Sequence, residues 1–166
     1  MSKESFTRDS TMAISVAYRL FGSGWSECTI FIGDSHATVT ASYLDDALGD
    51  FLRALSTILG GASESRASFA EEPGEYRWIF TRVAPDQLRV QILWFDELWN
   101  DMPDDRGKPV FDATCRLRTF AGAVLAASQR VLEEFGIDGY REKWIKHEFP
   151  LAEQAELERL LDQPDI

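Results

Sequence analysis

The sequence has 166 residues and a formal net charge of −11, with a pI near 4.6. Such a surface repels the phosphates of nucleic acids and of anionic lipids, so we expect neither nucleic acid nor a membrane as a partner. The length fits one domain, and 45% hydrophobic with 27% charged residues is typical of a globular protein. The two cysteines, Cys28 and Cys115, are too few for a disulfide framework, and we expect both to be buried thiols.

The two ends of the sequence differ in composition from the middle. Residues 1–11 are polar and charged and are predicted to form a flexible leader. A single α+β domain is expected over residues 12–161, followed by a frayed tail at residues 162–166. The leader lacks the apolar run of a signal peptide, and no stretch approaches the length of an apolar membrane span. We therefore expect a cytoplasmic location.

Alternation of apolar and polar residues predicts three strands in the first third of the chain. Ile14, Val16, Tyr18 and Leu20 share one face of the first strand. The second strand is expected over residues 25–32 and the third over residues 38–43, joined by tight turns into a meander.

A change to helical spacing predicts an amphipathic helix from Leu44 to Leu59. Ser42 or Asp45 is expected to cap its start, and the pair of glycines at 60 and 61 to end it.

A second series of strands, four in all, is predicted to begin after a polar stretch at residues 62–66, with the first strand before the turn at residues 71–75. Pro73 and Gly74 mark a turn within residues 71–75. Further strands are expected over residues 76–81, 88–94 and 109–115, and helices over residues 117–135, 138–146 and onward from Pro150. The order βββα-ββββ-ααα predicts an α+β fold with an antiparallel sheet of about six to seven strands and helices packed on one face.

The loop over residues 96–105 is the strongest candidate for a binding site. It contains five carboxylates and no Lys or Arg. Carboxylates steer a basic protein toward a surface, and a tryptophan contributes buried area to an interface. The predicted partner-binding residues are Asp96, Glu97, Trp99, Asp101, Met102, Asp104 and Asp105. The alternative is a solvated loop whose Trp99 folds back onto the core.

No residue pattern indicates a catalytic site, a metal site or a cofactor. His36 and His147 lack the spacing of zinc ligands, and neither has an identifiable nucleophile as a partner. The acidic loop does not follow the spacing of an EF-hand. Gly22 and Gly24 lack the third glycine and the helix start of a dinucleotide-binding loop. An enzyme is therefore the less favoured interpretation.

Three stretches, Ser42–Leu48, Glu72–Trp78 and Gly139–Trp144, resemble a family of uncharacterised bacterial single-domain α+β proteins. Their motifs are a helix start, a hairpin turn and a packing anchor, so this resemblance implies no activity for any residue. In size, acidity and strand-then-helix order the chain is also loosely similar to immunity proteins of bacterial polymorphic toxin systems.

Three functions follow from these observations as alternatives. The first is a non-enzymatic, immunity-like module that captures a basic protein partner through its acidic loop. The second is a small-ligand-binding protein or an enzyme with a pocket between sheet and helices. The third is a homo-oligomeric structural subunit, such as a homodimer formed through a sheet edge or the C-terminal helices.

Overall fold

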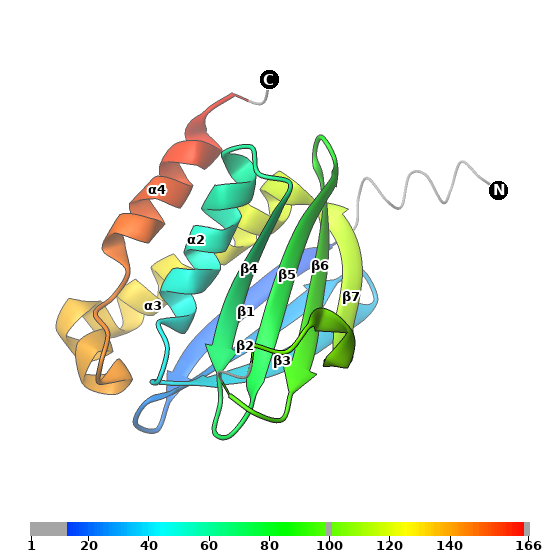
Figure 1. The fold of residues 1–166 in the computed structure, drawn as a ribbon. Coiled ribbons are helices and arrows are strands. Elements are labelled where there is room, and N and C mark those ends of the chain that lie inside the picture. The colour runs from blue at the N-terminus through cyan, green and yellow to red at the C-terminus, as the bar shows by residue number, and fades with distance from the viewer. Residues whose placement is uncertain (1–12, 99–100, 165–166) are drawn as a thin grey trace.

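The computed structural model describes residues 13–98 and 101–164, so the predicted leader at residues 1–11 lies outside the described residues. Within this part of the chain, seven antiparallel strands form two sheets, and three helices pack against them (Figure 1). The predicted α+β class and the antiparallel pairing are confirmed. The strands are divided between a three-stranded and a four-stranded sheet.

The first sheet is a meander of β1 (Ile14–Phe21), β2 (Trp25–Ile32) and β3 (Ser35–Ser42), in the order β1-β2-β3. The predicted alternation is confirmed, because Val16, Tyr18 and Leu20 are buried.

Helix α2 (Ala47–Leu59) buries the predicted apolar stripe, which includes Phe51, Leu52 and Leu55. Its N-cap is Asp46, whose carboxylate accepts a hydrogen bond from the Gly49 backbone N–H at 3.2 Å. The prediction of Ser42 or Asp45 as the cap was wrong. Ser42 is instead the last residue of β3, and its hydroxyl donates to the carbonyl of Ala70 at 3.0 Å.

The second sheet contains β4 (Glu64–Ala70), β5 (Glu75–Ala84), β6 (Gln87–Phe95) and β7 (Lys108–Arg116), paired in that order. A single turn of 3₁₀ helix, η1 (Asp104–Arg106), precedes β7. Strand β4 begins inside the stretch predicted to be a polar connection. Its polar residues are accommodated because Ser65 donates to the Ala54 carbonyl of α2 at 2.7 Å, while Glu64 and Arg66 are exposed.

Helix α3 (Leu117–Trp144) is broken at Gly136, which has φ 69° and ψ 178°. This is the predicted end of the first C-terminal helix, since glycine tolerates positive φ. Beyond the break, Tyr140 and Trp144 are fully buried. Helix α4 (Leu151–Asp162) follows Pro150 and lies against α2 and α3.

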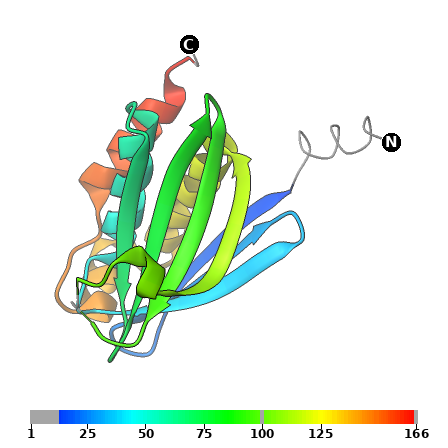
Figure 2. The same ribbon diagram turned by 45° about the vertical axis from the view of Figure 1, so that its right-hand side comes forward.

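The core lies between the two sheets and the helices, which gather on one side of the molecule (Figure 2). Large rings from α2, β4 and β5 meet at its centre, and the centroids of Phe51 and Trp78 are 4.6 Å apart. Cys28 and Cys115 are free and buried, as predicted. None of the helices in the described part of the chain combines the length and the apolar composition needed to cross a membrane.

Candidate functional site

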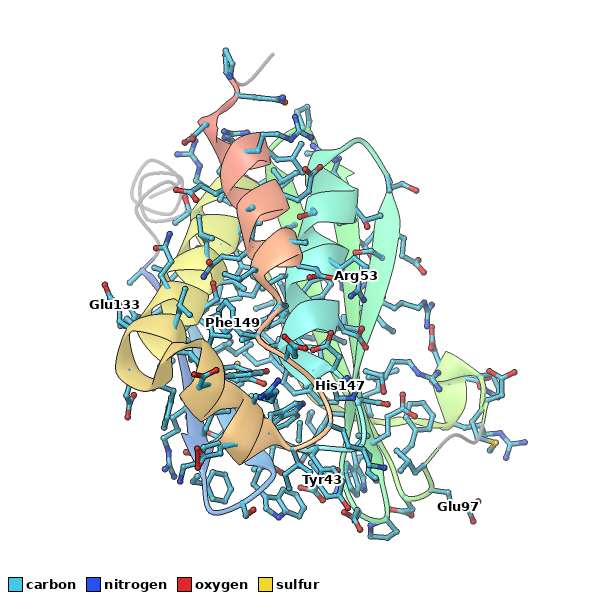
Figure 3. The ribbon with its side chains drawn as sticks, turned by 90° about the vertical axis from the view of Figure 1, so that its left-hand side faces the viewer. Tyr43, Arg53, Glu97, Glu133, His147 and Phe149 are labelled. Carbon is cyan, nitrogen blue, oxygen red and sulfur yellow. The ribbon has the colours of Figure 1, made fainter. Side chains whose placement is uncertain are left out.

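Three connections at one end of the molecule concentrate its negative charge. They are residues 43–46 between β3 and α2, residues 71–75 at the turn from β4 to β5, and residues 96–105, the part of the β6–β7 connection that precedes Arg106. Together these segments contain ten Asp or Glu residues and no Lys or Arg. We call these three segments the acidic end. Figure 3 shows Tyr43 and Glu97, from two of the connections, at this same end of the molecule.

Hydrogen bonds tie the three connections to the rest of the fold. Glu71 accepts a hydrogen bond from the hydroxyl of Thr40 on β3, which joins the β4–β5 turn to the first sheet. The indole Nε1 of Trp144 donates to the Asp45 carbonyl at 3.1 Å, so the second half of α3 supports the β3–α2 connection. The acidic end is therefore held by contacts between segments far apart in the sequence.

Asp104 is the most strongly bound carboxylate of the acidic end. Arg66 donates to both of its oxygens at 2.7 Å, and Arg77 donates to Oδ1 at 2.9 Å. The hydrogen bonds from Arg66, followed by those from Arg77, lower the pKa of Asp104 to about 2. Its charge is thus matched within the molecule, and Asp104 fixes the loop to β4 and β5.

A small apolar cluster holds the same loop on the outer face of the second sheet. Met102 packs against Ile79, Leu93 and Phe95, and its carbonyl accepts a hydrogen bond from Arg77 at 2.8 Å. The Arg77 guanidinium lies 4.0 Å from the centre of the Phe95 ring. Burial of this cluster and the Asp104 contacts together hold residues 102–104 against the second sheet.

The structure separates the predicted partner-binding residues into three groups. Asp104 and Met102 face the protein itself, as described above. Asp101 and Asp105 are exposed, as are Asp96 and Glu97, and Asp96 accepts a hydrogen bond from the indole of Trp94 at 2.8 Å. Trp99 lies outside the described residues.

A groove beside the loop contains carboxylates that the sequence analysis did not assign to the site. It has a volume of about 890 Å³ and lies between the start of α2, the outer face of β4 and β5, and residues 101–104. Within it the Ser68 hydroxyl donates to Glu75 at 3.0 Å and lies 3.5 Å from an oxygen of Asp45. Burial, then the negative charge of Asp50, raises the pKa of Asp45. The signal in the sequence was the excess of carboxylates in all three connections.

A second hollow, of about 580 Å³, lies at the tip of the acidic end. It draws on all three connections, and its lining residues are Leu44, Glu72, Pro73, Glu97 and Leu98. Leucine and proline side chains thus lie at the surface beside carboxylates.

Gly74 allows the turn that forms one side of this hollow to approach β6. A Cβ at this position would overlap the ring of Trp94 and the carbonyl oxygen of Phe95. Because a backbone carbonyl cannot move aside easily, only glycine fits here without a shift of the turn.

A third groove, of about 340 Å³, lies between α2 and the strands β4 and β5. Its arginines are already paired: Arg53 with Asp50 and Glu153, each at 2.8 Å, and Arg66 and Arg77 with Asp104. A charged ligand in this groove would have to compete with these ion pairs.

The two histidines lie in separate environments. His36 stacks on the exposed ring of Phe31, with 5.4 Å between ring centroids. His147 lies near the N-terminus of α2 and interacts electrostatically with Asp45 and Asp46 (Figure 3). Among the described residues, no group of three His, Cys, Asp or Glu side chains is arranged to hold a metal ion.

The fold is thus that of an α+β protein with two antiparallel sheets, bearing a strongly acidic end. No family model matches the chain, and no curated protein matches it. Among solved structures, the chain is similar to a chain of the "CdiA-CT/CdiI toxin and immunity complex from Enterobacter cloacae", with a TM-score of 0.47 and 14% sequence identity. The similarity covers 71% of this chain and 99% of that chain.

Proposed function

We propose that the protein is a protein-binding module whose acidic end captures a basic protein. The observation that carries this proposal is the concentration of ten carboxylates in residues 43–46, 71–75 and 96–105, which lie in three connections that meet at one end of the fold. A field of one sign accelerates the encounter with a partner of opposite charge and disfavours partners of the same charge.

The contacts of residues 101–107 with the second sheet support the same function. Asp104 and Met102 attach the loop to the second sheet, which leaves Asp101 and Asp105 exposed on a fixed backbone. A surface that is ordered before binding loses less conformational entropy when the complex forms. Charge and preorganisation therefore act together in this proposal.

The cost of keeping Asp45 charged also supports a cationic partner. Burial and the nearby charges of Asp50 and Glu75 raise its pKa, so its ionised form is disfavoured in the isolated protein. A Lys or Arg from a partner would stabilise that ionised form, since an opposite charge within a few ångströms lowers the pKa of a carboxyl group. In the immunity-like form of the proposal, the partner is a basic toxin.

The test compares two charge-reversal variants of the full chain. Asp101→Lys/Asp105→Lys changes the acidic end, and Glu133→Lys/Glu134→Lys makes the same change in charge at exposed positions on α3. Figure 3 shows Glu133 on the helical side, away from Glu97. Each tagged protein is used to retain partners from a lysate of the native host at low and high salt, and the retained proteins are identified by mass spectrometry.

The expected result is a basic protein that wild type and the α3 variant retain in stoichiometric amount and that elutes at high salt. With that protein purified, the acidic-end variant should associate about tenfold more slowly at low salt, whereas the α3 variant changes the rate less than about twofold. Equal rates for the two variants would rule out the acidic end as the contact. A protein that elutes alone as a dimer in size-exclusion chromatography would favour the structural-subunit alternative.

A further inference from the structure

We infer that the hollow lined by Leu44, Pro73 and Leu98 receives an apolar side chain of the basic partner, flanked in the partner's sequence by Lys or Arg. This inference rests on the proposed function and adds to it the chemistry of the contact. It identifies an anchor residue in the partner, where the proposed function required only positive charge.

The hollow is lined by apolar side chains that are open to solvent. Leu44 and Leu98 are half-buried and Pro73 is exposed, so apolar surface from three separate connections is left open to solvent at one place. Covering such surface with an apolar side chain is favourable by roughly 25 cal/mol per Å². Apolar anchors that fill a pocket surrounded by polar groups commonly dominate the energy of protein interfaces.

The carboxylates beside the hollow are complementary in charge to a basic segment. Glu72 and Glu97 line the hollow, and Glu71 and Asp96 precede them directly in the sequence. A free apolar ligand would gain nothing from these carboxylates, and an acidic segment would be repelled. A segment with an apolar residue between Lys or Arg residues complements both kinds of lining residue. Its apolar side chain covers the leucines and the proline, and its long cationic side chains reach outward to the carboxylates.

Tertiary contacts hold two of the three walls of the hollow. Gly74 sets the β4–β5 turn directly against Trp94 and Phe95, and the Ser42 hydroxyl joins the end of β3 to the end of β4. The walls formed by residues 44 and 73 therefore come from connections held by tertiary contacts. Walls that are fixed in this way avoid part of the entropy cost of binding.

The test measures the anchor separately from the charge by using two labelled peptides. One has the sequence Lys-Arg-Phe-Arg-Lys, and the other has Ser in place of Phe, so both carry the same charge. Fluorescence anisotropy gives the dissociation constant of each peptide for the wild-type full chain and for the variants Leu98→Ser, Leu44→Ser and Leu151→Ser. Leu151 is the matched control, since it is an exposed leucine on α4.

The Phe peptide should bind wild type at least about fivefold more tightly than the Ser peptide, as expected for partial burial of an aromatic ring. This ratio should fall below about twofold in Leu98→Ser and in Leu44→Ser and should persist in Leu151→Ser. Because two hollow variants on different connections are compared, local unfolding in one of them leaves the other to decide.

The remaining outcomes of the peptide experiment each contradict a different part of the proposal. Equal affinity of the two peptides for wild type, with binding that weakens at high salt, would overturn the apolar anchor and leave the proposed capture of a basic partner intact. A Phe preference that survives in both hollow variants would place the anchor elsewhere. Failure of both peptides to bind wild type at low salt would contradict the acidic end as a docking surface for basic segments.

Discussion

Asp104 and its neighbour Asp105 are adjacent carboxylates with opposite roles. Asp104 accepts hydrogen bonds from Arg66 and Arg77, whereas the side chain of Asp105 is exposed at the start of η1. The sequence alone gives no reason to distinguish them. We therefore expect equal changes in charge at these two positions to have unequal effects on stability.

Replacement of Asp104 by Asn should lower the free energy of unfolding at pH 7 by about 1 kcal/mol, the upper part of the range for partly exposed ion pairs. Asp105→Asn is the control and should change it by less than about 0.5 kcal/mol. Urea denaturation of the three proteins measures both values. A larger loss in Asp105→Asn would contradict the assignment of Asp104 as the residue that fixes the loop.

The effect of Asp104 should also depend on pH. Its pKa is lowered from 3.8 to about 2 in the folded protein, so its carboxylate stabilises the fold above about pH 4. That stabilisation is lost as the pH falls through about 2. The difference in unfolding free energy between wild type and Asp104→Asn should therefore shrink between these pH values. A difference that stays constant over this range would show that the charge of Asp104 is not its cause.

Gly74 should be as sensitive to an added methyl group as a core residue. In Gly74→Ala the new Cβ meets the Phe95 carbonyl and the Trp94 ring, which should destabilise the fold by about 1–3 kcal/mol. Gly122→Ala is the matched control, because a Cβ there meets no atom within 4 Å on helix α3. That change should stabilise the protein by up to about 1 kcal/mol. Thermal unfolding followed by circular dichroism measures both.

At the scale of elements, helix α2 depends on Asp46 for its first turn. Asp46→Ala removes the acceptor for the Gly49 N–H and should lower the free energy of unfolding by about 1 kcal/mol. Asp46→Asn keeps an acceptor oxygen. Because burial raises the pKa of Asp46, loss of its charge should cost little at neutral pH, and Asn should stay within about 0.5 kcal/mol of wild type. A large loss with Asn, measured by chemical denaturation, would mean that the charge matters more than the cap.

Most elements could be predicted because a single period dominates each of them. The alternation in β1 and the apolar stripe of α2 each follow from burial of one face. Gly136 ends the first part of α3 because glycine tolerates the positive φ found there. The start of β4 and the cap of α2 could not be predicted. The start of β4 depends on a tertiary contact, since Ser65 bonds to α2. Ser42 cannot serve as the cap because its hydroxyl bonds to the end of β4, and the cap is the local hydrogen bond between Asp46 and the Gly49 N–H.

At the scale of the whole molecule, the uneven distribution of charge should make stability depend on salt. At low ionic strength, carboxylates within about 10 Å of one another repel strongly, because few ions screen their charges. The melting temperature of wild type should rise by a few degrees between about 10 and about 300 mM NaCl. Glu72→Gln/Asp101→Asn/Asp105→Asn should lose at least about half of this rise.

The matched control neutralises three exposed glutamates of α3, in Glu133→Gln/Glu134→Gln/Glu142→Gln. It removes the same charge and should keep most of the salt dependence, because these side chains lie outside the acidic end. Differential scanning fluorimetry over a series of NaCl concentrations measures the melting temperatures of wild type and of both triple variants. An equal loss in both triple variants would mean that net charge alone sets the effect and that its placement is unimportant.

The candidate site was only partly visible in the sequence for a related reason. The loop at residues 96–105 stands out by composition, so its exposed carboxylates could be named in advance. Which of them is matched internally depends on Arg66 and Arg77, which lie on other strands. Leu44 and Pro73 join Leu98 only because β3, β4 and β6 end at the same place. The roles of these residues could therefore be assigned only from the three-dimensional structure.

The hydrogen bond from the Trp144 indole to the Asp45 carbonyl links positions 99 residues apart in the chain. A ribosome makes Asp45 long before Trp144, and α3 also supplies the buried Tyr140 beside it. The connection from β3 to α2 therefore reaches its final form only after residues 140–144 have been made. Under the proposed function, a nascent chain that ends before Trp144 would lack the hydrogen bond that supports the Asp45 side of the acidic end.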